Sequence, residues 1–289
     1  MTNQSRTLCA SAALMLFASC PAWASLSTQV ALAPGAQSPD ATQFISGTGT
    51  ATGTLTSNFG DSSYHATGTA IADYGVLKAY AQVTLENYLP NSYHSEGCGG
   101  FGCYLNDPVY ATAEFTDSLT ITGGIGTAYL VVTLDIDGST EKTSDLGIFS
   151  TAQGGATIYG DNNVALNTGF FGGTYTFNSE VIPFTYGVPI LLRVGLSAFS
   201  VAVDTQAETG GNPYNHRGKA DFLNTATLTS LAVYADSGMS NPASFAVSAS
   251  SGTVFPTILD PAAVPEPSAW IMLAMGGGAL GIRGRFGKQ

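Results

Sequence analysis

Apolar and polar residues alternate along most of this 289-residue chain. Every second position is apolar from Leu77 to Leu85, and the same period returns from Leu130 to Ile136. A period of two is typical of a strand with one buried and one solvated face, and no stretch of the sequence combines a sustained helical period with caps. Because a single sheet must cover its apolar face, the pattern predicts an all-β fold that closes as a β-sandwich, jelly-roll-like in its layout.

Turn-forming residues divide the predicted strands. Asp137-Gly138 is a strong hairpin-turn dipeptide, so a turn is predicted there, with a returning strand that begins at Glu141. The Gly-, Thr- and Ala-rich stretch 38–69 is either low-complexity strand or partly irregular, and residues 253–263, with two prolines, predict a linker after a β-domain at 25–252. Further strands are predicted at 111–115, 119–122, 190–203, 226–234 and 245–250.

The N-terminus has the layout of a secretory signal peptide. Arg6 is its only charge, and an apolar stretch from Leu8 to Ala18 leads to Ala22-Trp23-Ala24. Small residues two positions apart, here Ala22 and Ala24, mark a signal-peptidase cleavage site. We therefore expect export through the Sec translocon and removal of residues 1–24, with Ser25 as the new N-terminus. A lipoprotein reading, with Cys20 acylated after cleavage, stays open.

The C-terminus combines a rigid motif, a short apolar run and a basic end. Residues 269–282 carry no charge, and as a helix these 14 residues would cover about 21 Å. A membrane core of about 30 Å needs about 20 apolar residues, so the run is short for a permanent span, although a weak anchor remains the alternative. The three basic residues after the run would stay on the cytoplasmic side of the membrane. The motif comprises Val264, Pro265, Glu266, Pro267 and Trp270, and the basic end comprises Arg283, Arg285 and Lys288.

Residues 264–289 therefore resemble the PEP-CTERM sorting signal of Gram-negative bacteria, although here the basic end is interrupted by other residues. Three phrases of the central segment (115–123, 187–200 and 220–226) are similar to phrases in many PEP-CTERM ectodomains. The resemblance implies transient insertion in the inner membrane, recognition and removal of the tail by an exosortase, and delivery to the cell surface or an exopolysaccharide matrix.

Charge and cysteine usage agree with an exported segment. Residues 25–264 carry five basic and 19 acidic residues, which disfavours nucleic-acid binding because that needs clustered Lys and Arg. Once the signal peptide is removed, Cys98 and Cys103 form an even pair within a glycine-rich stretch. In an oxidising compartment this pair predicts a small loop closed by a disulfide.

Candidate chemical sites are weak. Asp135, Asp137 and Glu141 could supply oxygen ligands to calcium, but the spacing fails the EF-hand pattern and a plain hairpin is the simpler interpretation. Ser62, in Gly60-Asp61-Ser62, resembles the nucleophile of a GDSL esterase, but no Asp-x-x-His pair or α/β pattern accompanies it. No catalytic residue, metal or cofactor is therefore predicted, and the chain is not expected to be an enzyme.

Carbohydrate binding is the serious alternative to a purely structural or adhesive role. The central segment has no tryptophan but holds all 13 tyrosines. Their rings could stack on sugars, or they could sit at strand ends with hydrated hydroxyls. The tyrosines expected in loops are Tyr88, Tyr93, Tyr104, Tyr110 and Tyr214.

Overall fold

The computed structural model describes residues 24–32, 43–59, 62–88, 108–144, 149–161, 163–203 and 214–258. Every named element in these ranges is a strand, and none of the described residues lies in a helix long and apolar enough to cross a membrane. The all-β prediction is confirmed. The expected C-terminal helix and all but Ala24 of the signal peptide lie outside the described residues.

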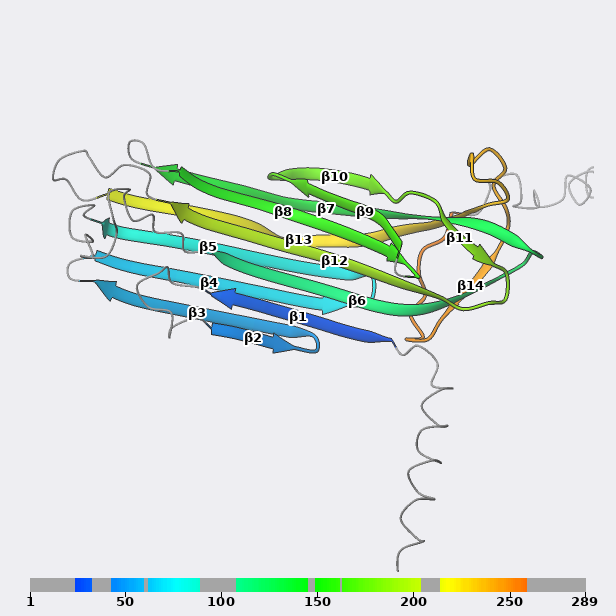
Figure 1. Ribbon diagram of the computed structural model, residues 1–289, viewed down its shortest axis with the longest axis horizontal. Helices are drawn as coiled ribbons and strands as arrows, with labels where there is room; N and C mark the ends of the chain where they lie inside the picture. The colour runs from blue at the N-terminus through cyan, green and yellow to red at the C-terminus, as the bar shows by residue number, and fades with distance from the viewer. Residues whose placement is uncertain are drawn as a thin grey trace, which may run out of the picture.

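Two antiparallel sheets form the two layers of an elongated sandwich (Figure 1). Sheet A has the order β2-β1-β6-β12-β8-β9, and β14 pairs with β6 beyond the start of β1. Its strands are β1 (Ser25–Leu32), β2 (Gln43–Gly47), β6 (Val109–Thr122), β8 (Phe149–Gly160), β9 (Asn163–Phe170), β12 (Ile190–Val203) and β14 (Ala246–Ala249).

Sheet B has the order β10-β7-β13-β5-β4-β3, and β11 pairs with β7. Its longest strand, β13, has 21 residues and lies between β7 and β5. The strands are β3 (Thr50–Phe59), β4 (Ser62–Asp73), β5 (Val76–Tyr88), β7 (Thr127–Ser144), β10 (Gly173–Asn178), β11 (Ile182–Thr185) and β13 (Tyr214–Tyr234). For the stretch 38–69 the sequence left strand and irregular chain both open. In the structure it contributes β2, β3 and the first two thirds of β4.

The core lies between the sheets and is built largely from small side chains where β4 and β5 face β1 and β6. Ala66, Ala70, Ala79 and Ala81 are all fully buried there. Gly68 also faces inward, and a Cβ on it would lie 2.5 Å from a methyl carbon of Val30. Small residues let the two layers approach closely in this half of the sandwich, so enlarging one of them would force the sheets apart.

The predicted hairpin at Asp137-Gly138 is wrong, because β7 continues through both residues to Ser144. Gly138 faces the core, where an added Cβ would lie 2.1 Å from a ring carbon of Phe222 and 2.6 Å from the carbonyl oxygen of Asp221. The glycine is required there by close packing against an aromatic ring and not by a turn.

The structure agrees with some of the predicted strand boundaries and differs from others. The strand at 190–203 is confirmed as β12, whereas the two strands predicted at 111–115 and 119–122 form one continuous strand, β6. Between them lies Asp117, a carboxylate with no exposed surface. A buried charge must be hydrogen-bonded, and the sequence alone does not show which groups supply the donors.

Those donors come from the C-terminal segment of the sandwich. The Asp117 carboxylate accepts hydrogen bonds from the Ser250 hydroxyl (2.8 Å) and from the Ser251 backbone N–H (3.1 Å) and hydroxyl. Beyond this contact, Phe255 is buried and stacks on Phe115 with ring centroids 6.1 Å apart.

The same segment then reaches sheet B, where Leu231 donates its N–H to Pro256 and accepts one from Ile258. The prediction of a linker from residue 253 is therefore wrong for residues 253–258, because buried aromatic contacts and backbone hydrogen bonds hold them on both sheets. Residues 259–263 lie outside the described part of the chain.

Candidate functional site

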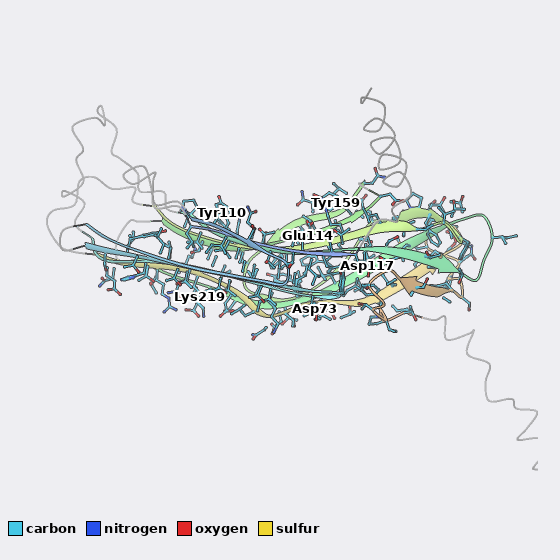
Figure 2. The ribbon with its side chains drawn as sticks, turned by 90° about the horizontal axis from the view of Figure 1, so that it is seen from below. Asp73, Tyr110, Glu114, Asp117, Tyr159 and Lys219 are labelled. Atoms are coloured by element: carbon cyan, nitrogen blue, oxygen red, sulfur yellow. The ribbon has the colours of Figure 1, made fainter. Side chains whose placement is uncertain are left out.

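The outer face of sheet A places residues from three neighbouring strands on one surface. Alternate residues of β12 point outward, and β12 lies between β6 and β8. In Figure 2, Tyr110, Glu114 and Tyr159 lie along the upper layer, whereas Lys219 lies on the lower layer.

One end of this surface carries two aromatic rings, which we call the aromatic pair. Tyr110 of β6 is opposite Phe199 of β12 in the register, and their ring centroids are 4.7 Å apart at an interplanar angle of 40°. The Tyr110 side chain is 47% exposed, and Phe199 is partly buried. An exposed tyrosine supported by a second ring presents a broad apolar surface whose hydroxyl remains in water.

Further along lies the charged cluster, formed by Arg193, Tyr159 and Glu114. The Arg193 guanidinium carbon lies 4.1 Å from the centre of the Tyr159 ring, and its Nε is 3.5 Å from Glu114 Oε2. The ring face attracts the cation, and stacking holds the guanidinium plane in place. Burial raises the pKa of the Glu114 carboxyl, and the positive charge of Arg193 opposes that rise.

The residues between the aromatic pair and the charged cluster have small side chains. Gly195 of β12 lies opposite Glu114 and Thr157, and an added Cβ would come within 2.6 Å of Thr157 Oγ1. Gly155 of β8 lies opposite Ser197, whose hydroxyl donates to the Gly155 carbonyl oxygen at 3.3 Å. Two glycines and short hydroxylated residues thus lie between the aromatic pair and the charged cluster, and Gly195 is itself buried beside the Thr157 hydroxyl and the Glu114 carboxylate.

Tyr110 is the predicted tyrosine whose side chain the structure describes, and its assignment to a loop is wrong because it lies within β6. Tyr88 ends β5 and Tyr214 begins β13, where the two are opposite each other in the register. Their side chains, and all of Tyr93 and Tyr104, lie outside what the structure describes.

The proposed calcium ligands do not converge. Asp135 and Glu141 lie six residues apart on the extended strand β7, which separates their backbones by about 20 Å. Asp137 accepts a hydrogen bond from the Thr174 hydroxyl at 3.0 Å, and Glu141 pairs with Lys219 at 3.1 Å. Asp135 keeps one buried carboxylate oxygen without a hydrogen-bond partner. Within the described ranges no three His, Cys, Asp or Glu side chains are grouped as a metal site.

The residues of the esterase interpretation are also apart. Ser62 begins β4, where it pairs with Phe59, and Asp61 lies outside the described residues. His216 lies on β13, and β5 runs between these two strands, so their backbones are about 10 Å apart. The other histidine among the described residues, His65, lies with its Nδ1 3.3 Å from the Thr56 hydroxyl.

The outer face of sheet B carries a different, internally paired set of groups. Lys219 lies 3.1 Å from both Glu141 and Asp221, and hydrogen bonds to Glu141 and Asp221 raise its pKa. Nearby, Gln82 accepts hydrogen bonds from the Tyr80 hydroxyl and from Arg217. These polar groups of sheet B are thus paired with one another.

Most of the residues predicted for the sorting signal, the signal-peptide cleavage site and the disulfide lie outside the described part of the chain. These are Ala22, Cys98, Cys103, Val264, Pro265, Glu266, Pro267, Trp270, Arg283, Arg285 and Lys288. Ala24 is described, and Ser25 begins β1, opposite Thr116 of β6.

Sequence reasoning missed Glu114, Tyr159, Arg193 and Phe199. They come from three strands that are distant in the sequence, and they form no local motif. The alternation of β12 does indicate that Arg193 and Phe199 share one face. Only the strand order shows that β6 and β8 lie on either side of β12.

No protein-family model matches this chain, and no curated protein matches it. Among solved structures, the comparison found the GH31 α-xylosidase Xac1773 of Xanthomonas citri, with 8% sequence identity and a TM-score of 0.12. The similarity covers 58% of this chain and 32% of the xylosidase. A TM-score this low establishes neither a shared fold nor a shared activity.

Proposed function

We propose that this protein is exported, processed by an exosortase, and held at the cell surface or in an exopolysaccharide matrix, where it acts structurally or as an adhesin. The Sec translocon would carry it through the inner membrane. The resemblance of residues 264–289 to a sorting signal is the origin of this proposal, and the position of the sandwich in the chain supports it.

The observation that carries the proposal is the position of the described sandwich between the two expected cleavage sites. Strand β1 starts at Ser25, directly after the expected signal-peptidase site. The last described residue is Ile258, which donates its backbone N–H to the carbonyl oxygen of Leu231 and precedes the Val264 motif. Cleavage at both sites would remove no described strand and no described core residue, so the sandwich could survive both processing steps.

The test combines localisation with mass spectrometry of both ends of the mature protein, in cells with and without the exosortase. We expect an N-terminus at Ser25 and a C-terminus upstream of Trp270, with loss of surface delivery when the exosortase is deleted. Glu266→Ala should reduce processing. Glu180→Ala, at an exposed acid outside the sorting motif, is the matched control and should be processed normally. A mature protein that still ends in Lys288-Gln289 would contradict the proposal.

Carbohydrate binding is a second candidate function, favoured by the exposure of Tyr110 beside Phe199 on sheet A. Such an activity is compatible with the first proposal, because a matrix protein needs a means of holding the matrix. The two can be tested separately, since delivery is a property of the terminal signals and binding is a property of the sandwich.

A further inference from the structure

We infer that an uncharged, β-linked polysaccharide binds along the outer face of sheet A, between the aromatic pair and the charged cluster. This inference deepens the proposed matrix role and rests on it for the source of the polysaccharide. It replaces the loop tyrosines of the sequence-based hypothesis with a surface on three paired strands.

The length and direction of the site follow from the register. Tyr159 lies opposite Arg193, and Phe199 is six residues further along β12, so the two ends of the site are about 20 Å apart along the strand. Tyr110 and Tyr159 lie on opposite sides of β12, so their strands are also about 10 Å apart across the sheet. The line between them crosses β12 near Gly195 and Ser197, whose own side chains are small. A ligand must therefore be long and narrow to contact both ends.

The two ends offer complementary chemistry to a sugar chain. The face of a β-linked hexose has C–H groups, which carry partial positive charge and stack on the electron-rich face of an aromatic ring such as Tyr110. At the other end, Arg193 supplies N–H donors and Glu114 supplies carboxylate acceptors for ring hydroxyls. The side chains of Arg193 and Glu114 are 42% and 31% exposed, so both can be reached by a ligand on this face.

Charge argues for a neutral polysaccharide. The whole chain has a formal net charge of −11, which would repel a polyanion such as alginate. At the site itself, the single positive charge of Arg193 is balanced by Glu114 at 3.5 Å. The site therefore offers hydrogen bonds and ring surface but no net positive charge to attract an acidic glycan.

The position of the site within the sheet argues against a peptide that adds as a strand. Strand β12 is paired along its length with β6 on one side and with β8 on the other. Its backbone N–H and C=O groups are therefore used within the sheet, and a ligand on this face can be bound only through side chains. A sugar chain, which carries many hydroxyls and flat ring faces, suits that mode of binding.

The test is affinity electrophoresis of the full-length chain in native gels containing barley β-glucan, konjac glucomannan, α-linked dextran or alginate. We expect retardation by the two β-linked polysaccharides and none by dextran or alginate. Tyr110→Ala, which removes the stacking surface, and Tyr159→Ala, which removes the ring that holds Arg193 in place, should each weaken binding about tenfold. Tyr80→Ala is the matched control, since this partly buried tyrosine lies on the outer face of sheet B.

A length series on the unaltered chain adds a test that does not depend on a variant folding. Cellohexaose should compete with β-glucan far better than cellobiose, and this advantage should shrink in Tyr159→Ala. The absence of retardation by either β-linked polysaccharide overturns the inference, as does stronger retardation by alginate or equal losses in Tyr80→Ala and Tyr110→Ala. None of these results bears on export, which the mass of the mature protein decides.

Discussion

The contact between Asp117 and the C-terminal segment should be a large local contribution to stability. The informative perturbation is Asp117→Ala, which removes the acceptor of three hydrogen bonds from Ser250 and Ser251. The segment that these bonds fix continues to Phe255, which is 3% exposed and stacks on Phe115. Loss of the carboxylate should therefore loosen both the hydrogen bonds and the ring contact.

The magnitude follows from the environment of the carboxylate. Hydrogen bonds to a charged group contribute about 1.5–3 kcal/mol each, and the cost of burying the charge offsets part of that sum. The two serines are partly exposed, so water can satisfy their freed donors. We expect Asp117→Ala to lower the free energy of unfolding by about 3 kcal/mol. Ser251→Ala, which removes a single hydroxyl donor to the carboxylate, should cost about 1 kcal/mol.

Urea unfolding of the full-length chain measures both values, and the double variant completes a cycle whose coupling energy should be about 1–2 kcal/mol. Asp73→Ala is the matched control: that carboxylate is exposed and accepts one backbone hydrogen bond from the next residue. It should change stability by about 0.5 kcal/mol or less. If Asp117→Ala were no more destabilising than Asp73→Ala, or if Asp117→Ala and Ser251→Ala were additive, the proposed role of this contact would be refuted.

Three further predictions test the packing and the titrating groups. Gly138→Ala should destabilise the fold by about 3 kcal/mol in urea unfolding, because its Cβ would overlap a buried ring. Gly169→Ala, with its nearest neighbour at 3.7 Å, should change stability little. Burial raises the pKa of Glu114, so the stability of the native chain should fall as the pH rises from the ordinary pKa of a glutamate through the raised one. Arg193→Gln removes the positive charge that opposes this shift and should raise the pKa of Glu114 further, which carboxyl NMR titration measures. A hydrogen bond from a backbone N–H four residues along is the main cause that lowers the pKa of Asp236. The contribution of Asp236 to stability should be present above the ordinary pKa of an aspartate and lost as the pH falls through the lowered value. Asp236→Asn should abolish this dependence of the free energy of unfolding on pH, measured by unfolding at a series of pH values.

The fold class could be predicted from the sequence because alternation is a local property. The period of two at Leu77–Leu85 needs no knowledge of neighbours, and it correctly placed those residues in a half-buried strand. The hairpin at Asp137-Gly138 was mispredicted because a glycine can satisfy a turn or a close contact, and the sequence does not distinguish them. The decisive neighbour, Phe222, lies 84 residues further along the chain.

The candidate site could be predicted only in fragments. Tyr110 was recognised as a ring that could stack on sugars, but its partner Phe199 and the cluster around Arg193 depend on strand order. Strand order in an antiparallel sandwich is set by long-range pairing across connections of many residues, which local patterns do not encode. A local sign of a long-range contact is an aspartate at a core-facing position of an alternating strand, as Asp117 is between Phe115 and Leu119.

The way residues 250–258 are fastened has a mechanical consequence. The segment is bonded to Asp117 on β6 and to Leu231 on β13, and each of these strands has a paired neighbour on both sides. Tension applied beyond Ile258 would first load the few hydrogen bonds that hold residues 250–258, and through them one interior strand of each layer. An edge strand can be peeled off one hydrogen-bonded pair at a time, whereas an interior strand must break two ladders together. A pull from the C-terminal side would therefore reach strands that are hard to detach only after the contacts of residues 250–258 have broken.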